Sequence, residues 1–150
     1  MPERFSPLPD EAFIFRLVDP GSRFLPADAQ LPIPDWFEPS STDKEEGERR
    51  GRNPGLSVWD QAGASVENAR HLTGRANGIA FGLSVDDCKR IGQSYERVLS
   101  VVADPLDARA PTPGWDAHSL VEGLKRPPHV ERRVHKDLLA ELAHSCQKVA

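Results

Sequence analysis

The nine residues IAFGLSVDD, at positions 79–87, carry the clearest structural signal in the chain. Ile79, Phe81 and Leu83 alternate with small residues, and this period of two is typical of a β-strand. Ser84 is followed three residues later by Asp87, which is the spacing with which a hydroxyl and a carboxylate begin a helix. The sequence therefore predicts a strand that runs directly into a helix, and this helix should end near residue 92.

Other strand and helix patterns lie on both sides of this unit. Runs of strand length occupy residues 12–18, 56–59, 98–103 and 118–122. The apolar run at 98–103 (VLSVVA) is predicted to be a central strand buried on both faces. A short helix is expected from the cap Ser65 to the stop Gly74, and a long C-terminal helix with one apolar stripe over about 130–149. Because strands and helices do not alternate regularly, we predict an α+β fold with a mixed or mostly antiparallel sheet and about three helices.

The chain divides into three stretches of different composition. Eight of its 14 prolines lie before residue 40, so residues 1–39 are predicted to be an extended proline-rich segment. Residues 40–53 (SSTDKEEGERRGRN) combine charge with glycine and contain no apolar side chain, which is typical of a flexible loop. Residues 54–150 are predicted to form the main body. A length of 150 residues suits a single small domain.

The composition of the chain indicates which kinds of partner and which cellular location to expect. A net charge of −4 provides no general attraction to phosphate, so nucleic acid is an unlikely partner. Cys88 and Cys146 both fall at apolar positions of expected helices, which indicates core residues and no disulfide. The N-terminus lacks the pattern of a secretory signal, and no apolar run approaches the length of a membrane span. We therefore expect a cytoplasmic protein without membrane contact.

One histidine is a candidate catalytic residue. Asp116 and His118 are two residues apart at the start of an expected strand, so both would face the same side. A carboxylate beside an imidazole can orient it for general-base catalysis, although such a pair can also form a simple surface turn. The other four histidines show no metal-ligand spacing, and no metal site is expected; they are His71, His129, His135 and His144.

A second group of residues resembles a known family. Arg16, the stretch GRNPGLSVW at 51–59 and the helix start SVE at 65–67 resemble an arrangement found in RES-domain toxins, over about a third of the chain. Those proteins are similar in fold to ADP-ribosyltransferases and act on NAD. The resemblance implies that Arg16 and Arg52 contact NAD, that Trp59 is the stacking aromatic residue and that Glu67 is the catalytic acid. The chain departs from the family in having Trp59 in place of tyrosine and in lacking a recognisable later serine motif.

Two hypotheses about function follow. The first is an accessory or regulatory protein, without a cofactor, that binds another protein within a prokaryotic-type multi-protein system. Its binding residues would be Phe24, Trp36 and Phe37 of the proline-rich segment, and Arg49 and Arg50 of the charged loop.

The alternative is a small enzyme that acts on NAD or another nucleotide. It would use the residues of the RES-like arrangement, together with His118 as a possible base. The two hypotheses differ in one structural expectation: the large apolar residues between positions 24 and 37 must be covered either by this domain or by a partner.

Overall fold

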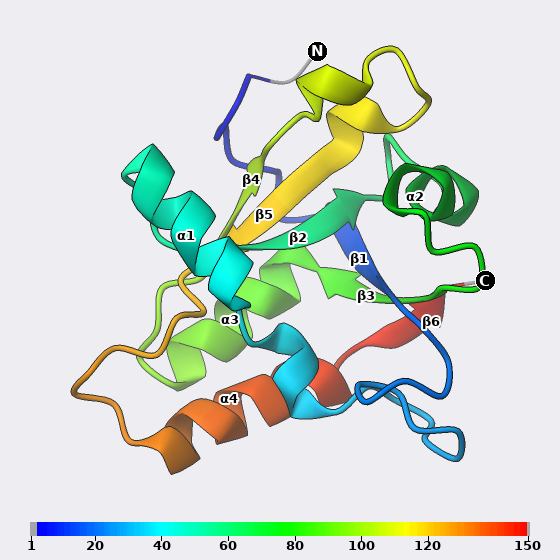
Figure 1. Ribbon diagram of the computed structural model, residues 1–150. Coiled ribbons are helices and arrows are strands. Elements are labelled where there is room, and N and C mark those ends of the chain that lie inside the picture. Colours follow the sequence, from blue (N-terminus) through cyan, green and yellow to red (C-terminus); the bar gives the residue numbers. More distant parts are fainter. Residues whose placement is uncertain (1–2, 150) are drawn as a thin grey trace.

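The strand predicted from residues 12–18 lies inside a six-stranded sheet in which every neighbouring pair is antiparallel (Figure 1). A computed structural model describes residues 3–149 of the chain. The strand order is β4-β5-β2-β1-β3-β6. The strands are β1 (Phe13–Val18), β2 (Gly55–Asp60), β3 (Ile79–Ser84), β4 (Ser100–Ala103), β5 (His118–Glu122) and β6 (Gln147–Val149). The predicted α+β fold with a mostly antiparallel sheet is confirmed.

In the part of the chain that the structure describes, four α-helices and three short 3-10 helices accompany the sheet. They are α1 (Ser41–Arg50), α2 (Val66–Thr73), α3 (Val85–Ser94), α4 (Arg132–His144), η1 (Pro34–Phe37), η2 (Asp107–Arg109) and η3 (Trp115–Ala117). The predicted helix starts are confirmed, since the hydroxyls of Ser65 and Ser84 accept hydrogen bonds from the main-chain NH groups of Asn68 and Asp87. Gly74 ends α2 in the left-handed conformation.

The two faces of the sheet support two separate apolar cores. On one face, Ile14, Val58 and Phe81 pack with apolar residues of α3 and α4, such as Leu138 and Leu142. On the other face, a smaller core forms beneath α2, where β1 and β2 contribute the residues of odd number. Because the smaller core ends at Trp59, the part of this second face made by β2 and β5 is free to line a cavity.

The apolar run at 98–103 forms an edge strand, so the prediction of a central position was wrong. β4 pairs with β5 on one side only. Its other side is covered by the N-terminal segment, where the NH groups of Phe5 and Leu8 donate to the oxygens of Ala103 and Val101 at 2.6 and 3.0 Å. This cover explains why residues 101–103 are buried, whereas Val98, which precedes the strand, is 88% exposed.

Residues 40–53 form a helix, so the prediction of a flexible loop was wrong. Ser40 and Asp43 make a reciprocal capping box at the start of α1, and Gly51 ends the helix in the left-handed conformation. Gly47 faces the chain that follows the helix, because a Cβ atom there would lie 2.8 Å from the oxygen of Arg52. The helix is thus stabilised by its caps and by docking, which compensate for its lack of an apolar stripe.

The apolar residues of the proline-rich segment are covered by the domain itself. Trp36 and Phe37 in η1 are only 4% and 3% exposed and pack edge to face against each other. Trp36 also contacts Phe81 of β3, and η1 rests against α4 (Figure 1). These two residues were predicted to bind a partner, but in this structure their side chains belong to the core.

The C-terminal helix is shorter than predicted. α4 ends at His144, and the chain then forms the short strand β6 along the edge of β3. Cys146, which the apolar stripe placed in the helix, is buried between the two elements. None of the helices within residues 3–149 has the length and apolar character that crossing a membrane requires.

Candidate active site

A cavity of about 280 Å³ lies over the face of the sheet formed by β2 and β5. Ser57, His118 and Leu120 of these two strands form its floor, and α1 forms one wall. The ring of Phe5, from the N-terminal segment, closes another side. Residues from five separate parts of the chain therefore meet around one small space.

Three neighbouring strands bring a serine, a histidine and an aspartate together beside this cavity. Ser57 is the third residue of β2, and its side chain lines the cavity. His118, the first residue of β5, lines the same cavity. Asp104 directly follows β4, where its NH donates to the main-chain oxygen of His118 at 2.9 Å. The order β4-β5-β2 thus places the three residues next to one another.

The hydrogen bonds of His118 define which of its ring nitrogens carries the proton. Nδ1 lies 2.8 Å from the main-chain oxygen of Asp104, and Nε2 lies 3.1 Å from the Oγ atom of Ser57. A carbonyl oxygen only accepts, so Nδ1 of the neutral imidazole must donate and Nε2 must accept. The Ser57 hydroxyl therefore donates to Nε2, which is the arrangement that activates a nucleophile in serine hydrolases.

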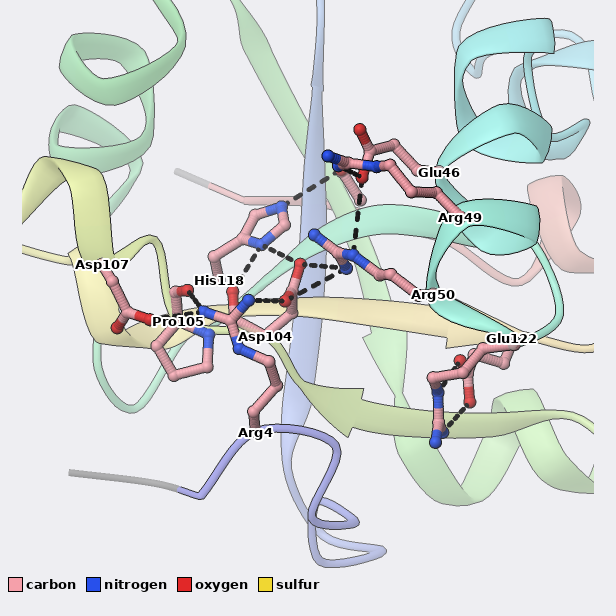
Figure 2. A network of polar contacts seen from close by, with 11 residues as sticks. Arg4, Glu46, Arg49, Arg50, Asp104, Pro105, Asp107, His118 and Glu122 are labelled. Carbon is pink, nitrogen blue, oxygen red and sulfur yellow. Dashed lines mark hydrogen bonds and ion pairs between the residues drawn. The ribbon is translucent and has the colours of Figure 1, made fainter.

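The carboxylate of Asp104 is the centre of a network of positive groups (Figure 2). One of its oxygens is 3.4 Å from Nδ1 of His118 and 3.3 Å from the guanidinium of Arg50, and the other is 3.5 Å from Arg4. Its side chain is only 5% exposed. Burial on its own would raise the pKa of Asp104, but the hydrogen bond with His118 and the charges of His118 and Arg50 lower it below the usual range. The aspartate is therefore ionised at neutral pH.

A second ion pair closes the opposite end of the cavity. Arg52 donates from Nε and Nη2 to the two carboxylate oxygens of Glu122 at 2.9 and 2.7 Å, and its guanidinium lies over the ring of Phe5. This hydrogen bond raises the pKa of Arg52. Such a two-point contact fixes the orientation of both side chains. Arg52 was predicted to bind a cofactor, and the structure places it in the same cavity as His118.

The other residues of the RES-like arrangement do not join them. Arg16 lies on the face of the sheet opposite the cavity, where its guanidinium stacks over Trp36. Trp59 is buried and packs edge to face against the ring of His118, with the two ring centroids 5.1 Å apart. Glu67 is 78% exposed on α2 and pairs with Arg70. The predicted NAD site is thus divided between two faces of the sheet and an exposed helix.

His118 was predicted from the sequence, but its two hydrogen-bond partners were not. The carboxylate next to His118 is that of Asp104, whereas Asp116 was expected to hold it. Asp104 could have been noticed as the first polar residue after an apolar strand. Ser57 had a weaker signal, as a small polar residue within a strand, because nothing in the sequence shows which strand lies beside β2.

The remaining predicted contact residues have other roles in the structure. Phe24 is half-buried beneath the guanidinium of Arg23. Arg49 forms an ion pair with Glu46 on the same helix, and Arg50 contacts Asp104. Both arginines were predicted to lie in a flexible loop, but they belong to the last turn of α1.

The two cysteines are unpaired and buried, as the apolar spacing predicted. Burial raises the pKa of both thiols, Cys88 and Cys146, to about 12. Within residues 3–149, no three histidine, cysteine, aspartate or glutamate side chains gather in a way that could hold a metal ion.

Comparisons with known proteins gave no match to a family model, to a curated protein or to a solved structure.

Proposed function

We propose that this protein is a small hydrolase in which Ser57 is the nucleophile and His118 is the general base. In this proposal Asp104 orients the imidazole ring and stabilises its protonated form. The observation that carries the proposal is the Ser57 hydroxyl, which lies 3.1 Å from Nε2 of His118 and is exposed to the cavity. The opposite ring nitrogen is held by Asp104, which completes the order nucleophile, base and orienting group.

The expected reaction is acyl transfer to water. The Oγ atom of Ser57 attacks a carbonyl carbon as its proton moves to Nε2 of His118, and the resulting imidazolium is stabilised by the Asp104 carboxylate. His118 then gives this proton to the leaving group, and an acyl-serine remains. Water attacks the acyl-serine with His118 again as base, which releases the acid and restores Ser57. The side chains of Arg50 and Arg52 provide NH groups in the same cavity for the developing oxyanion.

The cavity favours a small acyl substrate without a polyphosphate. Its volume of about 280 Å³ lies just below the usual range for small-molecule sites. Its walls carry four carboxylates against two guanidinium groups, and both guanidinium groups already contact carboxylates; the acids are Asp43, Glu46, Asp104 and Glu122. The pyrophosphate of NAD would meet net negative charge there, so these features support a hydrolase over the NAD-acting alternative.

The accessory-protein hypothesis stays a prediction. Its strongest argument was a set of exposed aromatic residues, and Trp36 and Phe37 are covered by the protein's own core.

A fluorophosphonate probe, which reacts covalently with activated serines, tests the hydrolase proposal. We expect the intact protein to be labelled at Ser57, as located by mass spectrometry of its peptides. Ser57→Ala should lose the label, and His118→Asn should be labelled at least about 10²-fold more slowly, because a general base contributes that much or more. Ser94→Ala, which removes an exposed hydroxyl on α3, is the matched control and should react as the wild type does.

Thermal unfolding of each variant separates a lost catalytic group from a lost fold. An unlabelled wild-type protein would contradict the proposal. So would a folded His118→Asn variant that reacts at the wild-type rate, since the histidine would then not activate Ser57.

A further inference from the structure

A second and larger cavity lies on the other side of α1. Its volume is about 650 Å³, within the range of small-molecule sites. One wall is formed by η1 and the start of α1, and the other by the start of α4 and the chain that follows β5. None of the residues of the proposed catalytic group lines it.

The walls of this cavity carry an excess of positive charge that is unusual for a chain with a net charge of −4. Six cationic side chains and two carboxylates line it. Both carboxylates are engaged, because Asp35 pairs with Arg23 at 3.3 Å and Glu38 contacts His135 at 2.6 Å. The other five cations form no ion pair within residues 3–149; they are Lys44, Lys125, Arg126, Arg132 and Lys136. Charge is therefore concentrated here without an internal partner.

The first turn of α4, which borders this cavity, carries basic side chains where acidic ones are usual. Anionic side chains normally occupy the first turn, because the NH groups and the helix dipole are positive there. α4 instead begins with Arg132 and Arg133, has no acidic residue in this turn, and its N-cap Glu131 makes no side-chain capping bond. Positive side chains next to the positive end of a helix are electrostatically unfavourable, and an anion bound at this helix start would offset that cost.

Buried groups hold the cavity wall in place. Arg97 is only 6% exposed, and it donates to the main-chain oxygens of Gly123 and Lys125 at 2.7 and 2.9 Å. It also lies 3.2 Å from Nδ1 of His135. A guanidinium only donates, so Nδ1 accepts, and the proton on Nε2 is directed to Glu38. Glu38 is thereby held by the protein, and Arg97 adds a further positive charge behind the wall.

From these observations we infer that this cavity binds the phosphate groups of a phosphorylated small molecule, with Arg132 and Lys136 of α4 and Lys44 of α1 as the contacting residues. The unpaired cations and the open helix start both fit a multiply charged anion. A nucleic acid fits less well, because its backbone requires an extended basic surface and the rest of this chain is acidic overall.

Titration with inorganic pyrophosphate, followed by calorimetry and by amide chemical shifts, tests this inference. We expect saturable binding, with shifts centred on the first turn of α4 and on Lys44. The double variant Arg132→Gln/Lys136→Gln should bind pyrophosphate at least roughly tenfold more weakly than the wild type. The reason is that hydrogen bonds from charged groups to phosphate are stronger than those between neutral groups. The control Arg109→Gln/Lys148→Gln removes the same charge from exposed positions outside the cavity and should bind like the wild type.

Three results would overturn the inference. These are no binding of pyrophosphate, equal weakening in the two double variants, and much tighter binding of a thymidine oligonucleotide with shifts that extend far beyond the cavity. Ser57→Ala should bind pyrophosphate normally, since that residue lies in the other cavity. The two sites can therefore fail or succeed independently.

Discussion

Arg16 donates from Nε to the main-chain oxygen of Ser57 at 2.9 Å, across a gap between β1 and β2. The two strands pair only at Ile14 with Asp60 and at Phe15 with Trp59, and they separate beyond these positions. The oxygen of Ser57 thus has no main-chain NH partner in β1, and the side chain of Arg16 supplies the donor. Arg16 also donates to the oxygen of Trp36, so one side chain connects the proposed nucleophile's strand with η1.

Replacement of Arg16 by methionine should lower the free energy of unfolding by about 2 kcal/mol, because two main-chain oxygens lose their donor. Urea denaturation measures this change. Arg90→Met, which removes an exposed ion pair on α3, is the control and should alter stability by less than about 1 kcal/mol. Equal effects of the two substitutions would show that the Arg16 hydrogen bonds do not stabilise the fold.

Asp104→Asn should slow the labelling of Ser57, but less than His118→Asn does. The main-chain oxygen of Asp104 still holds Nδ1 in this variant, so only the charge that stabilises the imidazolium is lost. We expect a decrease of roughly tenfold to a hundredfold in the labelling rate. Asp116→Asn is a matched control, because this carboxylate precedes His118 in sequence but makes none of its hydrogen bonds in the described structure. Slower labelling in Asp116→Asn alone would reverse the assignment of the two acids.

Acid should destabilise the wild type more than it destabilises Asp104→Asn. The folded-state pKa of Asp104 lies below its ordinary value of about 3.9. Its contribution to stability is therefore fully present above that ordinary value and is lost as the pH falls through the lower, folded-state pKa. Urea denaturation of both proteins between neutral and strongly acidic pH should show the steeper loss in the wild type. Parallel curves would mean that this carboxylate has the same proton affinity in the folded and unfolded chain.

Gly47→Ala should destabilise the protein, although alanine is the better helix former by about 1 kcal/mol. A Cβ atom at this position would lie 2.8 Å from the oxygen of Arg52 and 2.9 Å from the nitrogen of Pro54. Relief of these contacts requires α1 to move, at a cost of about 1–3 kcal/mol. Thermal unfolding and protease cleavage within residues 40–53 measure the effect. A stabilised variant would show that α1 is not docked against the following chain, and Glu48→Ala, on an exposed position of the same helix, is the control.

Cys88 and Cys146 should be almost unreactive toward Ellman's reagent in the folded protein. Burial excludes the reagent and raises the pKa of both thiols to about 12, so little thiolate forms even at mildly alkaline pH. Both should react rapidly once urea unfolds the chain. Rapid reaction of either thiol without denaturant would show that the core around α3 and α4 opens readily.

Several elements could be predicted because their signals are local. The start of α3 depends on Ser84 and Asp87, which are three residues apart, and the end of α2 depends on the conformation of Gly74 alone. The same capping signal is present in α1, where Ser40 and Asp43 have this spacing, but the absence of apolar residues led to the prediction of a flexible loop. A strong cap at both ends was therefore the better guide to that helix than hydrophobic pattern.

The sequence by itself determined five of the six strands and three of the four α-helices described within residues 3–149, together with the α+β class. These features depend on side-chain periodicity and on hydrogen bonds between close neighbours in the chain. Only the tertiary structure decided the order of the strands and the partners of His118. Its hydrogen bonds reach Asp104 and Ser57, which are 14 and 61 residues away, and β4 became an edge strand because the N-terminal segment covers it. Contacts at such separations result from how the strands pair and which face each side chain occupies, and no local pattern specifies that choice.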